Sequence, residues 1–343
     1  MLANGGRAGM QTQVGLLAHG LRDAGCAVTI ACGPGHLDVH DVEVARLPAL
    51  NSPSAPLFAR ELRRLVKRTS PHVVHGHGLR LAPLLRIVAR RRSLVTCHGI
   101  DPDRLEWTAA MLRATRIRVA SCGEGPRRLL EGKGVPSLLL NNAVPPMPEP
   151  LSRQAIASRF KLDPDATIVV SPARFTAQKD PVTMVRALAY AQGVSGILIG
   201  GGPLERDVLE EVSRHNLAGR VAVAGWLGDA RAVLAGADIV GLASVWEGQP
   251  TVVLEAMAAG VPVVATACPG IEDTVVDGVT GLLAAPRDAV SLGRAFVRAA
   301  GDPALRGRLV AGGRAAVASH TVDAVVGAHL EAYQTLLAGR WPA

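Results

Sequence analysis

Two glutamates, Glu247 and Glu255, stand at the two ends of a run, WEGQPTVVLEAMAAGVPVVAT, that is otherwise apolar and broken by glycine and proline. Residues 248–250 have the composition of a turn, and 251–259 have that of a helix, for which Pro250 suits the first position. The apolar run 239–243 before them is typical of a strand. The turn therefore follows the carboxyl end of a strand, where α/β sheets bind ligands and helix N-termini receive phosphate.

In that position one acid can contact a sugar and the other a ribose, with a diphosphate between them. The alternative is ordinary: Glu247 caps the helix and Glu255 is solvated. A second polar segment, SPARFTAQKDP, follows the predicted strand 168–171 and carries Arg174 and Lys179. Two cations at a strand's carboxyl end can neutralise a leaving diphosphate, although such a pair alone is more often surface charge.

Glycine-rich turns follow other predicted strands. Residues 200–204 read GGGPL, and glycines there let backbone approach a ligand. Residues 5–9 read GGRAG before the first helix; they lack the G-x-G-x-x-G spacing, which disfavours a nicotinamide cofactor.

Histidines mark the ends of predicted strands in the first half, at His75, His77 and His98. The pair His75 and His77 has the spacing of two metal ligands, but no third ligand follows at a convincing distance, so we predict no metal site. We expect these histidines to face a crevice between two domains instead.

Short Val/Ile/Leu runs alternate with amphipathic helical stretches along the whole chain, which predicts parallel sheets covered by helices. The fold class is therefore α/β, with two doubly wound, Rossmann-like domains. The predicted strands are 27–31, 42–47, 72–75, 94–97, 117–121 and 138–140 in the first half, and 168–171, 196–199, 221–224, 239–243, 261–266 and 281–284 in the second.

The domain boundary is predicted from prolines. Four of them lie within 145–150 and cannot continue a helix or a central strand. We predict a first domain at 1–144, a linker at 145–152, a second domain at 153–320, and a helix within 321–343 that returns to the first domain. Only four residues precede Gly5, whereas a strand normally has about five. The first strand therefore looks truncated, and we hypothesise a natural start codon upstream of Met1.

The positive charge of the chain is concentrated in its first half. Residues 1–150 hold 20 Lys+Arg against 11 Asp+Glu, whereas the rest is nearly balanced. The clearest source is LFARELRRLVKRT, where basic residues recur at helical spacing opposite leucines. We favour a solvated helix face; the alternative is a surface that meets anionic lipid or an acidic substrate.

Composition excludes several classes of protein. With 48% apolar and 19% charged residues the chain can bury a large core, and it has no apolar run long enough to span a membrane and no leader-like start. We therefore expect a cytoplasmic protein, with peripheral contact at the inner face of the membrane as the alternative. Five scattered cysteines predict neither disulfides nor a zinc knuckle, and ten aromatics with no recognisable module disfavour nucleic acid. The oligomeric state is not predicted.

Together these motifs resemble the family 4 glycosyltransferases, which are retaining enzymes of the GT-B fold. The resemblance covers nearly the whole chain. It rests on Glu247-GQPTVVL-Glu255, which matches the family's E-x7-E motif, and on GGRAGMQTQV, His98-Gly99, Arg174-x4-Lys179, GGGPL and PGIEDTVVDGVTGLL.

The resemblance implies a role for each matching residue. Arg174 and Lys179 would bind the donor's phosphates, Glu255 the ribose hydroxyls, and Glu247 the hydroxyls of the transferred sugar. His98 would contact the sugar near the reacting centre. Backbone of the two glycine turns and of the turn before the helix would approach the donor, at Gly6, Gly201, Gly248, Gln249, Pro250, Thr251 and Val252.

The implied reaction moves a hexose from a nucleoside-diphosphate sugar to an acceptor hydroxyl with retention, without metal or other cofactor. Glu247 is not well placed to act as a nucleophile, so the leaving phosphate would accept the acceptor's proton. The acceptor could be a glycan, a lipid-linked sugar or a small metabolite. Alternatives are an epimerase or hydrolase of nucleotide sugars with the same fold, and a non-catalytic nucleotide-sugar binding protein.

Two positions depart from the family's pattern. The usual Asn-Gly-Val at the end of the first domain reads Asn142-Ala143-Val144, and Gln13 stands where many relatives have histidine.

Overall fold

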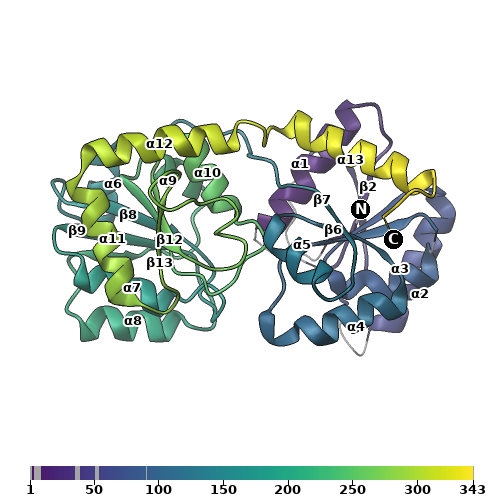
Figure 1. The fold of residues 1–343 in the computed structure, drawn as a ribbon, viewed down its shortest axis with the longest axis horizontal. Coiled ribbons are helices and arrows are strands. Elements are labelled where there is room, and N and C mark those ends of the chain that lie inside the picture. Colours follow the sequence, from purple (N-terminus) through teal and green to yellow (C-terminus); the bar gives the residue numbers. More distant parts are fainter. Residues whose placement is uncertain (1, 4–8, 35–38, 51–53, 90, 343) are drawn as a thin grey trace. The chain divides into compact units, whose positions relative to one another are not determined.

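The computed structural model describes residues 2–3, 9–34, 39–50, 54–89 and 91–342 of the chain. They form two compact units (Figure 1). Unit 1 consists of Met1–Pro145 and His320–Ala343, and unit 2 of Pro146–Ser319. Each unit is built on its own parallel sheet, so the predicted α/β class is confirmed.

Unit 1 contains a seven-stranded parallel sheet in the order β3-β2-β1-β4-β5-β6-β7. The first strand has only two residues but lies in the middle, paired with β2 and β4. The strands are β1 (Leu2–Ala3), β2 (Thr29–Cys32), β3 (Glu43–Arg46), β4 (Val74–His77), β5 (Ser93–Cys97), β6 (Arg118–Ser121) and β7 (Ser137–Leu139). β4 and β5 are buried along their whole length, as expected for a sheet covered on both faces.

The helices of unit 1 include one from the end of the chain, which packs against the first (Figure 1, yellow and purple). α1 buries Leu17 and Leu21 at helical spacing, and both belong to one apolar cluster with Val326 of α13. A Cβ on Gly20 of α1 would lie 2.4 Å from a Val326 methyl, so a small residue permits this close approach. The helices are α1 (Gly9–Asp23), α2 (Ala55–Thr69), α3 (Ala82–Val88), α4 (Leu105–Thr115), α5 (Glu124–Glu131) and α13 (Val322–Leu337), with 3-10 turns at Leu79–Leu81 and Pro102–Arg104.

Unit 2 contains a six-stranded parallel sheet in the order β10-β9-β8-β11-β12-β13. Its strands are β8 (Thr167–Pro172), β9 (Val194–Ile199), β10 (Val221–Val223), β11 (Ile239–Leu242), β12 (Val263–Thr266) and β13 (Leu282–Ala284). Its helices are α6 (Arg153–Phe160), α7 (Pro181–Tyr190), α8 (Glu205–Arg214), α9 (Ala230–Ala235), α10 (Thr251–Ala259), α11 (Ala289–Gly301) and α12 (Pro303–Val317). The strand order reverses direction beside β8, between β8 and β11, which makes the carboxyl ends of these two strands the expected ligand site.

The twelve strands predicted from sequence are all present, with shifts at their ends. The largest shift is at β4, predicted at 72–75 but observed at Val74–His77. Ser70 ends α2 in the left-handed conformation, and the chain becomes extended only beyond it. β4 therefore begins two residues later than predicted. His75 therefore lies inside β4 rather than at its end. Pro250 is also one residue displaced: it is the N-cap of α10, and Thr251 is the first helical residue.

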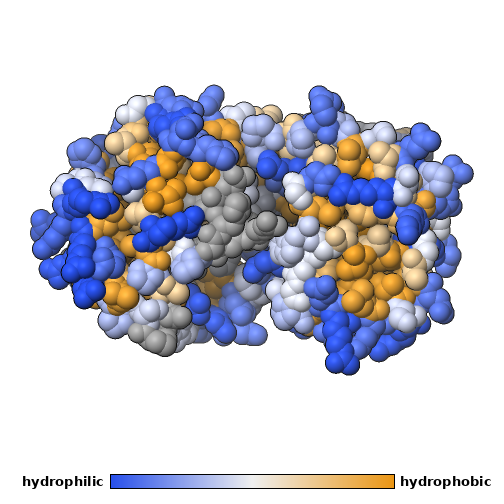
Figure 2. All heavy atoms as spheres, turned by 180° about the vertical axis from the view of Figure 1, so that it is seen from behind, coloured by the Kyte–Doolittle hydropathy of each residue, from blue (hydrophilic) through white to orange (hydrophobic). Residues whose placement is uncertain are grey.

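The surface of each unit is mixed. Figure 2 shows hydrophilic side chains, drawn blue, projecting at the margins, and apolar ones, orange, in the areas between them. Within the described residues, no helix has the length and apolar character that a membrane crossing requires. All five cysteines are free thiols, and four of them are buried.

Candidate functional site

Loops at the carboxyl ends of β8 and β11 bring two of the predicted residues of unit 2, Lys179 and Glu247, into contact. The Lys179 ammonium forms an ion pair with Oε1 of Glu247. The Ser244 hydroxyl donates a hydrogen bond of 2.6 Å to the same oxygen. Lys179 is 18% exposed and Glu247 5%. A carboxylate this deeply buried is stable as an anion only when it is paired and hydrogen-bonded, and here it is both.

Lys179 is positioned by the helix that follows it. Asp180 caps the N-terminus of α7: its carboxylate accepts the Thr183 backbone N–H at 3.2 Å and the Thr183 hydroxyl at 2.7 Å. Pro181 occupies the first turn, where its missing N–H costs nothing. The loop is thus fixed one residue after Lys179, and α7 itself is anchored by buried residues such as Met184.

Two further hydrogen bonds join the Lys179 loop to the Glu247 turn. The Val245 N–H donates to the Gln178 carbonyl at 2.8 Å, and the Gln178 amide donates to the Trp246 carbonyl at 3.1 Å. Gln178 was not singled out from the sequence, since a glutamine in a polar loop gives no signal. Its effect is to hold Lys179 and Glu247 at ion-pairing distance although they are 68 residues apart.

A third loop supports Glu247 from the carboxyl end of β12. The Glu247 N–H donates to the Pro269 carbonyl at 2.8 Å. Gly270 has φ +88°, and a Cβ there would lie 2.5 Å from the Gly248 carbonyl oxygen. Gly270 therefore positions the turn that contains Glu247. The PGIED motif signalled this loop in the sequence, but not its contact with the turn.

The GGGPL turn has a supporting role that sequence reasoning did not predict. Gly200 has φ +143°, and a Cβ there would lie 1.9 Å from the Ala173 carbonyl oxygen. The Phe175 N–H donates to the Gly201 carbonyl at 3.0 Å. The turn thus packs flat against the loop that carries Arg174, whose own side chain is exposed.

Adjacent glycines in this turn give a matched pair of variants. Gly200→Ala is expected to destabilise the protein by about 3 kcal/mol or more, because backbone strain and a clash with backbone coincide. Gly201→Ala is expected to leave stability nearly unchanged: its φ is ordinary, and its Cβ would meet only side-chain atoms, at 3.1 Å from Trp226 and 3.4 Å from Glu205. Denaturant unfolding measures both. Equal stability of the two variants would contradict the assigned packing.

Trp226 is a second residue that the sequence did not flag. It follows β10, is 49% exposed, and lies beside Gly201. An exposed indole at the carboxyl edge of a ligand-binding sheet offers a flat apolar surface to a planar ring. The exposed aromatic could have been noticed in GWLGDA, but only the fold places it next to the glycine turn.

Glu255 lies in the second turn of α10 and is 8% exposed, so the alternative of a solvated acid is wrong. Burial raises its pKa to about 7, and the charge of Arg231 on α9 opposes this rise. Near neutral pH the carboxyl is thus close to its titration midpoint. α10 starts directly after Pro250 with no side-chain cap, so Gly248, Gln249, Thr251 and Val252 present backbone at a helix N-terminus.

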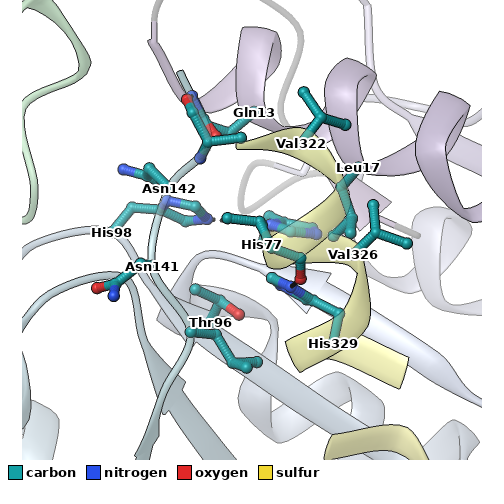
Figure 3. Close-up of a pocket in the computed structure, with 13 residues that line it drawn as sticks. Gln13, Leu17, His77, Thr96, His98, Asn141, Asn142, Val322, Val326 and His329 are labelled. Atoms are coloured by element: carbon teal, nitrogen blue, oxygen red, sulfur yellow. Dashed lines mark hydrogen bonds between the residues drawn. The ribbon is translucent and has the colours of Figure 1, made fainter. Parts of the chain in front are cut away.

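Unit 1 gathers histidines from two strands and a distant helix around a small pocket (Figure 3). His98 follows β5, and its Nε2 lies 3.0 Å from Nδ1 of His77. The His75 ring stacks on that of His77 with centroids 4.2 Å apart, and its Nδ1 lies 2.9 Å from the Tyr333 hydroxyl of α13. The pocket has a volume of about 20 Å³, which is the size of one water molecule.

The histidine cluster is held neutral by burial. Desolvation lowers the pKa of His98 and of His329 to about 4, and lowers those of His75 and His77 well below the usual value. Neighbouring histidines lower the pKa values of His75, His77 and His98 further, since each added proton would repel the next. A neutral imidazole at His98 can accept or donate a hydrogen bond to a ligand hydroxyl without adding charge.

The two residues that depart from the family's pattern, Gln13 and Ala143, contact each other. The Gln13 carboxamide donates to the Ala143 carbonyl at 2.8 Å and accepts the Ala143 N–H at 2.7 Å. Both residues line the pocket of Figure 3. A histidine cannot make this two-way contact with one peptide group, so Gln13 and the turn at Ala143 are matched to each other. Gly6, the predicted contact in the first loop, lies outside the described residues.

Within the described ranges, no group of three or more His, Cys, Asp or Glu has metal-binding geometry. The predicted donor residues of unit 2 follow the carboxyl ends of β8, β9 and β11, and His98 follows the carboxyl end of β5 in unit 1.

Solved structures define the class to which this fold belongs. Anabaena HepE, in complex with UDP-glucose, superposes with a TM-score of 0.83 at 18% identity, over 97% of this chain and 98% of its own. Sucrose-phosphate synthase from Thermosynechococcus elongatus superposes with a TM-score of 0.84 at 23% identity, over 98% of this chain and 96% of its own. The fold is therefore GT-B, as the resemblance implied.

Sequence comparisons define the family. The model for "Glycosyl transferase 4-like domain" matches residues 8–173, and that for "Glycosyl transferases group 1" matches 166–302. The chain belongs to this glycosyltransferase family, which confirms the resemblance. The lipopolysaccharide core biosynthesis glycosyltransferase LpsE of Rhizobium meliloti is 36% identical over 52% of this chain and 54% of its own length. A D-inositol 3-phosphate glycosyltransferase of Xylanimonas cellulosilytica is 28% identical over 74% of this chain and 66% of its own length. The alignment with LpsE thus spans about half of that relative.

Proposed function

We propose that this protein is a retaining glycosyltransferase that moves a hexose from a nucleoside-diphosphate sugar to an acceptor hydroxyl. The observation that carries the proposal is the buried Lys179–Glu247 ion pair at the carboxyl ends of β8 and β11. Glu255 lies in α10, the helix that follows Glu247. Such an arrangement offers a cation to a diphosphate and two separate carboxyl groups to a sugar and a ribose. Family membership supports the same assignment.

The proposed roles follow from the contacts. Both donors to Glu247, Lys179 and Ser244, engage Oε1, so Oε2 is the oxygen that can accept sugar hydroxyls. Lys179 and Arg174 stabilise the leaving diphosphate by preorganised positive charge. Glu255 accepts the ribose hydroxyls, and Trp226 supports the base.

In the proposed reaction the bond between the sugar's C1 and the diphosphate oxygen breaks. The acceptor oxygen bonds to C1 on the same face, and its proton goes to the departing phosphate. No metal is needed in this scheme because Lys179 and Arg174 supply the positive charge, so EDTA should not lower the rate.

The test is the release of nucleoside diphosphate from a panel of nucleotide sugars, with and without acceptors. UDP-glucose is the first donor to try, since the HepE structure contains it. Release only in the presence of an acceptor supports the proposal. Release without acceptor indicates a hydrolase, and binding without turnover indicates a non-catalytic binding protein.

The affinity for a nucleotide sugar is expected to rise with pH up to about 7. Only the ionised form of Glu255 accepts two hydroxyl donors, and its pKa of about 7 leaves it largely protonated below that pH. The expected slope approaches about tenfold per pH unit on the acid side. A nucleotide sugar is the right probe because its phosphates do not titrate in this range. Glu255→Gln should abolish the slope, and a flat wild-type profile would contradict the assignment.

We further propose peripheral contact with anionic membrane through α2. Arg63, Arg64 and Arg68 are exposed on it, although Glu61 and Glu43 pair with two of them. Leu57 on the same helix is 42% exposed. The protein is expected to float with phosphatidylglycerol vesicles at low salt and to lose this association at high salt. No flotation at low salt would indicate a soluble acceptor.

A further inference from the structure

Unit 1 contains a second and much larger cavity, with a volume of about 640 Å³. Arginines dominate its wall, and none of the described residues that line it is acidic. A volume of this size is typical of sites for small organic ligands. The arginines are Arg86, Arg91, Arg113, Arg116 and Arg118.

The cavity lies at the opposite edge of the sheet from His98. Arg118 begins β6, Pro136 immediately precedes β7, and Arg91 lies just before β5. These are the amino ends of the strands, whereas His98 follows the carboxyl end of β5. Strands of four to five residues separate the two edges by about 13 to 17 Å. The cavity is therefore distinct from the reacting centre proposed above.

Three of the arginines that line the cavity have no carboxylate partner among the described residues. Across the described part of the chain, no carboxylate pairs with Arg86, Arg91 or Arg116. Arg113 donates to the Lys133 backbone carbonyl, and Glu106 interacts with its charge from outside the cavity wall. Like charges that face one concave surface repel one another and concentrate a positive potential. Guanidinium groups bind phosphate oxygens in pairs, so an anion of this type would relieve the repulsion.

The rest of the wall is apolar and contains an unused donor. Leu112, Ile117 and Val135 contribute aliphatic surface, and Trp341, after α13, contributes an indole. The Trp341 Nε1–H is buried, and the described residues offer it no acceptor. A buried donor without a partner costs free energy, which a ligand oxygen would recover. The wall thus fits a charged group attached to an apolar one.

We propose that this cavity binds a phosphate-bearing anion that has an apolar or aromatic portion. The ligand is either a soluble phosphorylated compound or the headgroup region of an anionic phospholipid, which share this chemistry. The site does not depend on the proposed transferase reaction, because it lies in unit 1 and contains none of the donor residues.

Phenyl phosphate is the probe, titrated by calorimetry into the full chain at pH 8 with saturating UDP to occupy the donor site. Three proteins are compared: wild type, the cavity variant R86Q/R91Q/R116Q, and the control R63Q/R64Q/R68Q. The control removes the same charge from exposed positions on α2. We expect the cavity variant to bind at least about tenfold more weakly and the control to change less than about threefold. Equal affinities in all three, or no saturable binding to wild type at millimolar concentration, would overturn the proposal.

Thermal unfolding separates binding from folding. Removing three repelling charges should leave the midpoint temperature of unfolding unchanged or raise it. Adding phenyl phosphate should raise that temperature in wild type but not in the cavity variant. A midpoint lowered in the cavity variant, with the ligand-induced rise retained, would show a structural role and no site.

Vesicle flotation identifies the source of the ligand. If the cavity variant loses both phenyl phosphate binding and flotation with phosphatidylglycerol vesicles, the ligand is a lipid headgroup. If it loses phenyl phosphate binding but floats like wild type, the ligand is a soluble phosphorylated compound. Nucleotide-sugar affinity and turnover, measured on the same variant, report independently on the proposed function.

Discussion

Replacing Lys179 with alanine is expected to lower kcat about 100- to 1000-fold, a loss of about 2.7 to 4 kcal/mol of transition-state stabilisation. In the proposed reaction the ammonium stabilises the negative charge that develops on the leaving diphosphate. The Asp180 cap and the Gln178 hydrogen bonds fix the loop that carries Lys179. The rate of nucleoside diphosphate release with acceptor measures the effect. Activity within twofold of wild type would reject the assignment.

The same substitution also removes the partner of a buried carboxylate. Stranding the charge of Glu247 is expected to destabilise unit 2, since broken buried pairs cost about 3 to 5 kcal/mol. The double variant Lys179→Ala with Glu247→Gln separates the two effects: it should regain most of the stability but not the activity. Lys133→Ala, which breaks an exposed ion pair with Glu106, should change neither.

Acidification is expected to destabilise unit 1 well before most carboxylates are protonated. The folded-state pKa values of His75, His77, His98 and His329 are all lowered by burial, whereas in the unfolded chain histidines titrate near 6.5. The unfolded state therefore binds more protons as the pH falls from about 6.5 to about 4. Stability should be constant above about 7 and fall below 6.5, by about 1.4 kcal/mol per pH unit for each such histidine.

A single variant tests the histidine contribution. The Nδ1–H of His329 donates to the Val325 carbonyl at 2.7 Å, and a glutamine amide can replace that donor. His329→Gln should reduce the slope of unfolding free energy against pH by about 1.4 kcal/mol per unit. His72→Gln, at an exposed position, is the control and should leave the slope unchanged. Urea unfolding, with hydrogen exchange to resolve unit 1, gives the slopes, and identical slopes for all three proteins would contradict the prediction.

Much of the fold follows from local sequence pattern. Runs such as Ile168 to Ser171 form buried strands because branched apolar side chains favour the pleated, covered interior of a parallel sheet. The helix after Glu247 ends at Gly260 because glycine adopts its φ of +75° without strain. Errors were confined to the ends of elements, as at β4, where a left-handed residue at Ser70 is not visible in the pattern.

Candidate residues for the donor side could also be chosen from the sequence, because each follows a predicted strand and belongs to a recognisable motif. Glu247, Glu255, Arg174 and Lys179 could therefore be chosen from spacing and family resemblance. Their mutual contacts could not be chosen in this way. Local pattern specifies neither rotamers nor partners across 68 residues, and the ion pair exists because β8 and β11 are neighbours in the sheet.

The sequence by itself determined the two parallel sheets, the helix that contains Glu255 and the family of the chain. Tertiary structure alone decided that Lys179 neutralises Glu247, that Gln13 is matched to the peptide of Ala143 across 130 residues, and that five arginines surround one cavity. The physical reason is the same in each case. Periodicity and propensity act over one or two turns, whereas ion pairs, buried hydrogen bonds and concentrated charge arise only when distant strand ends meet.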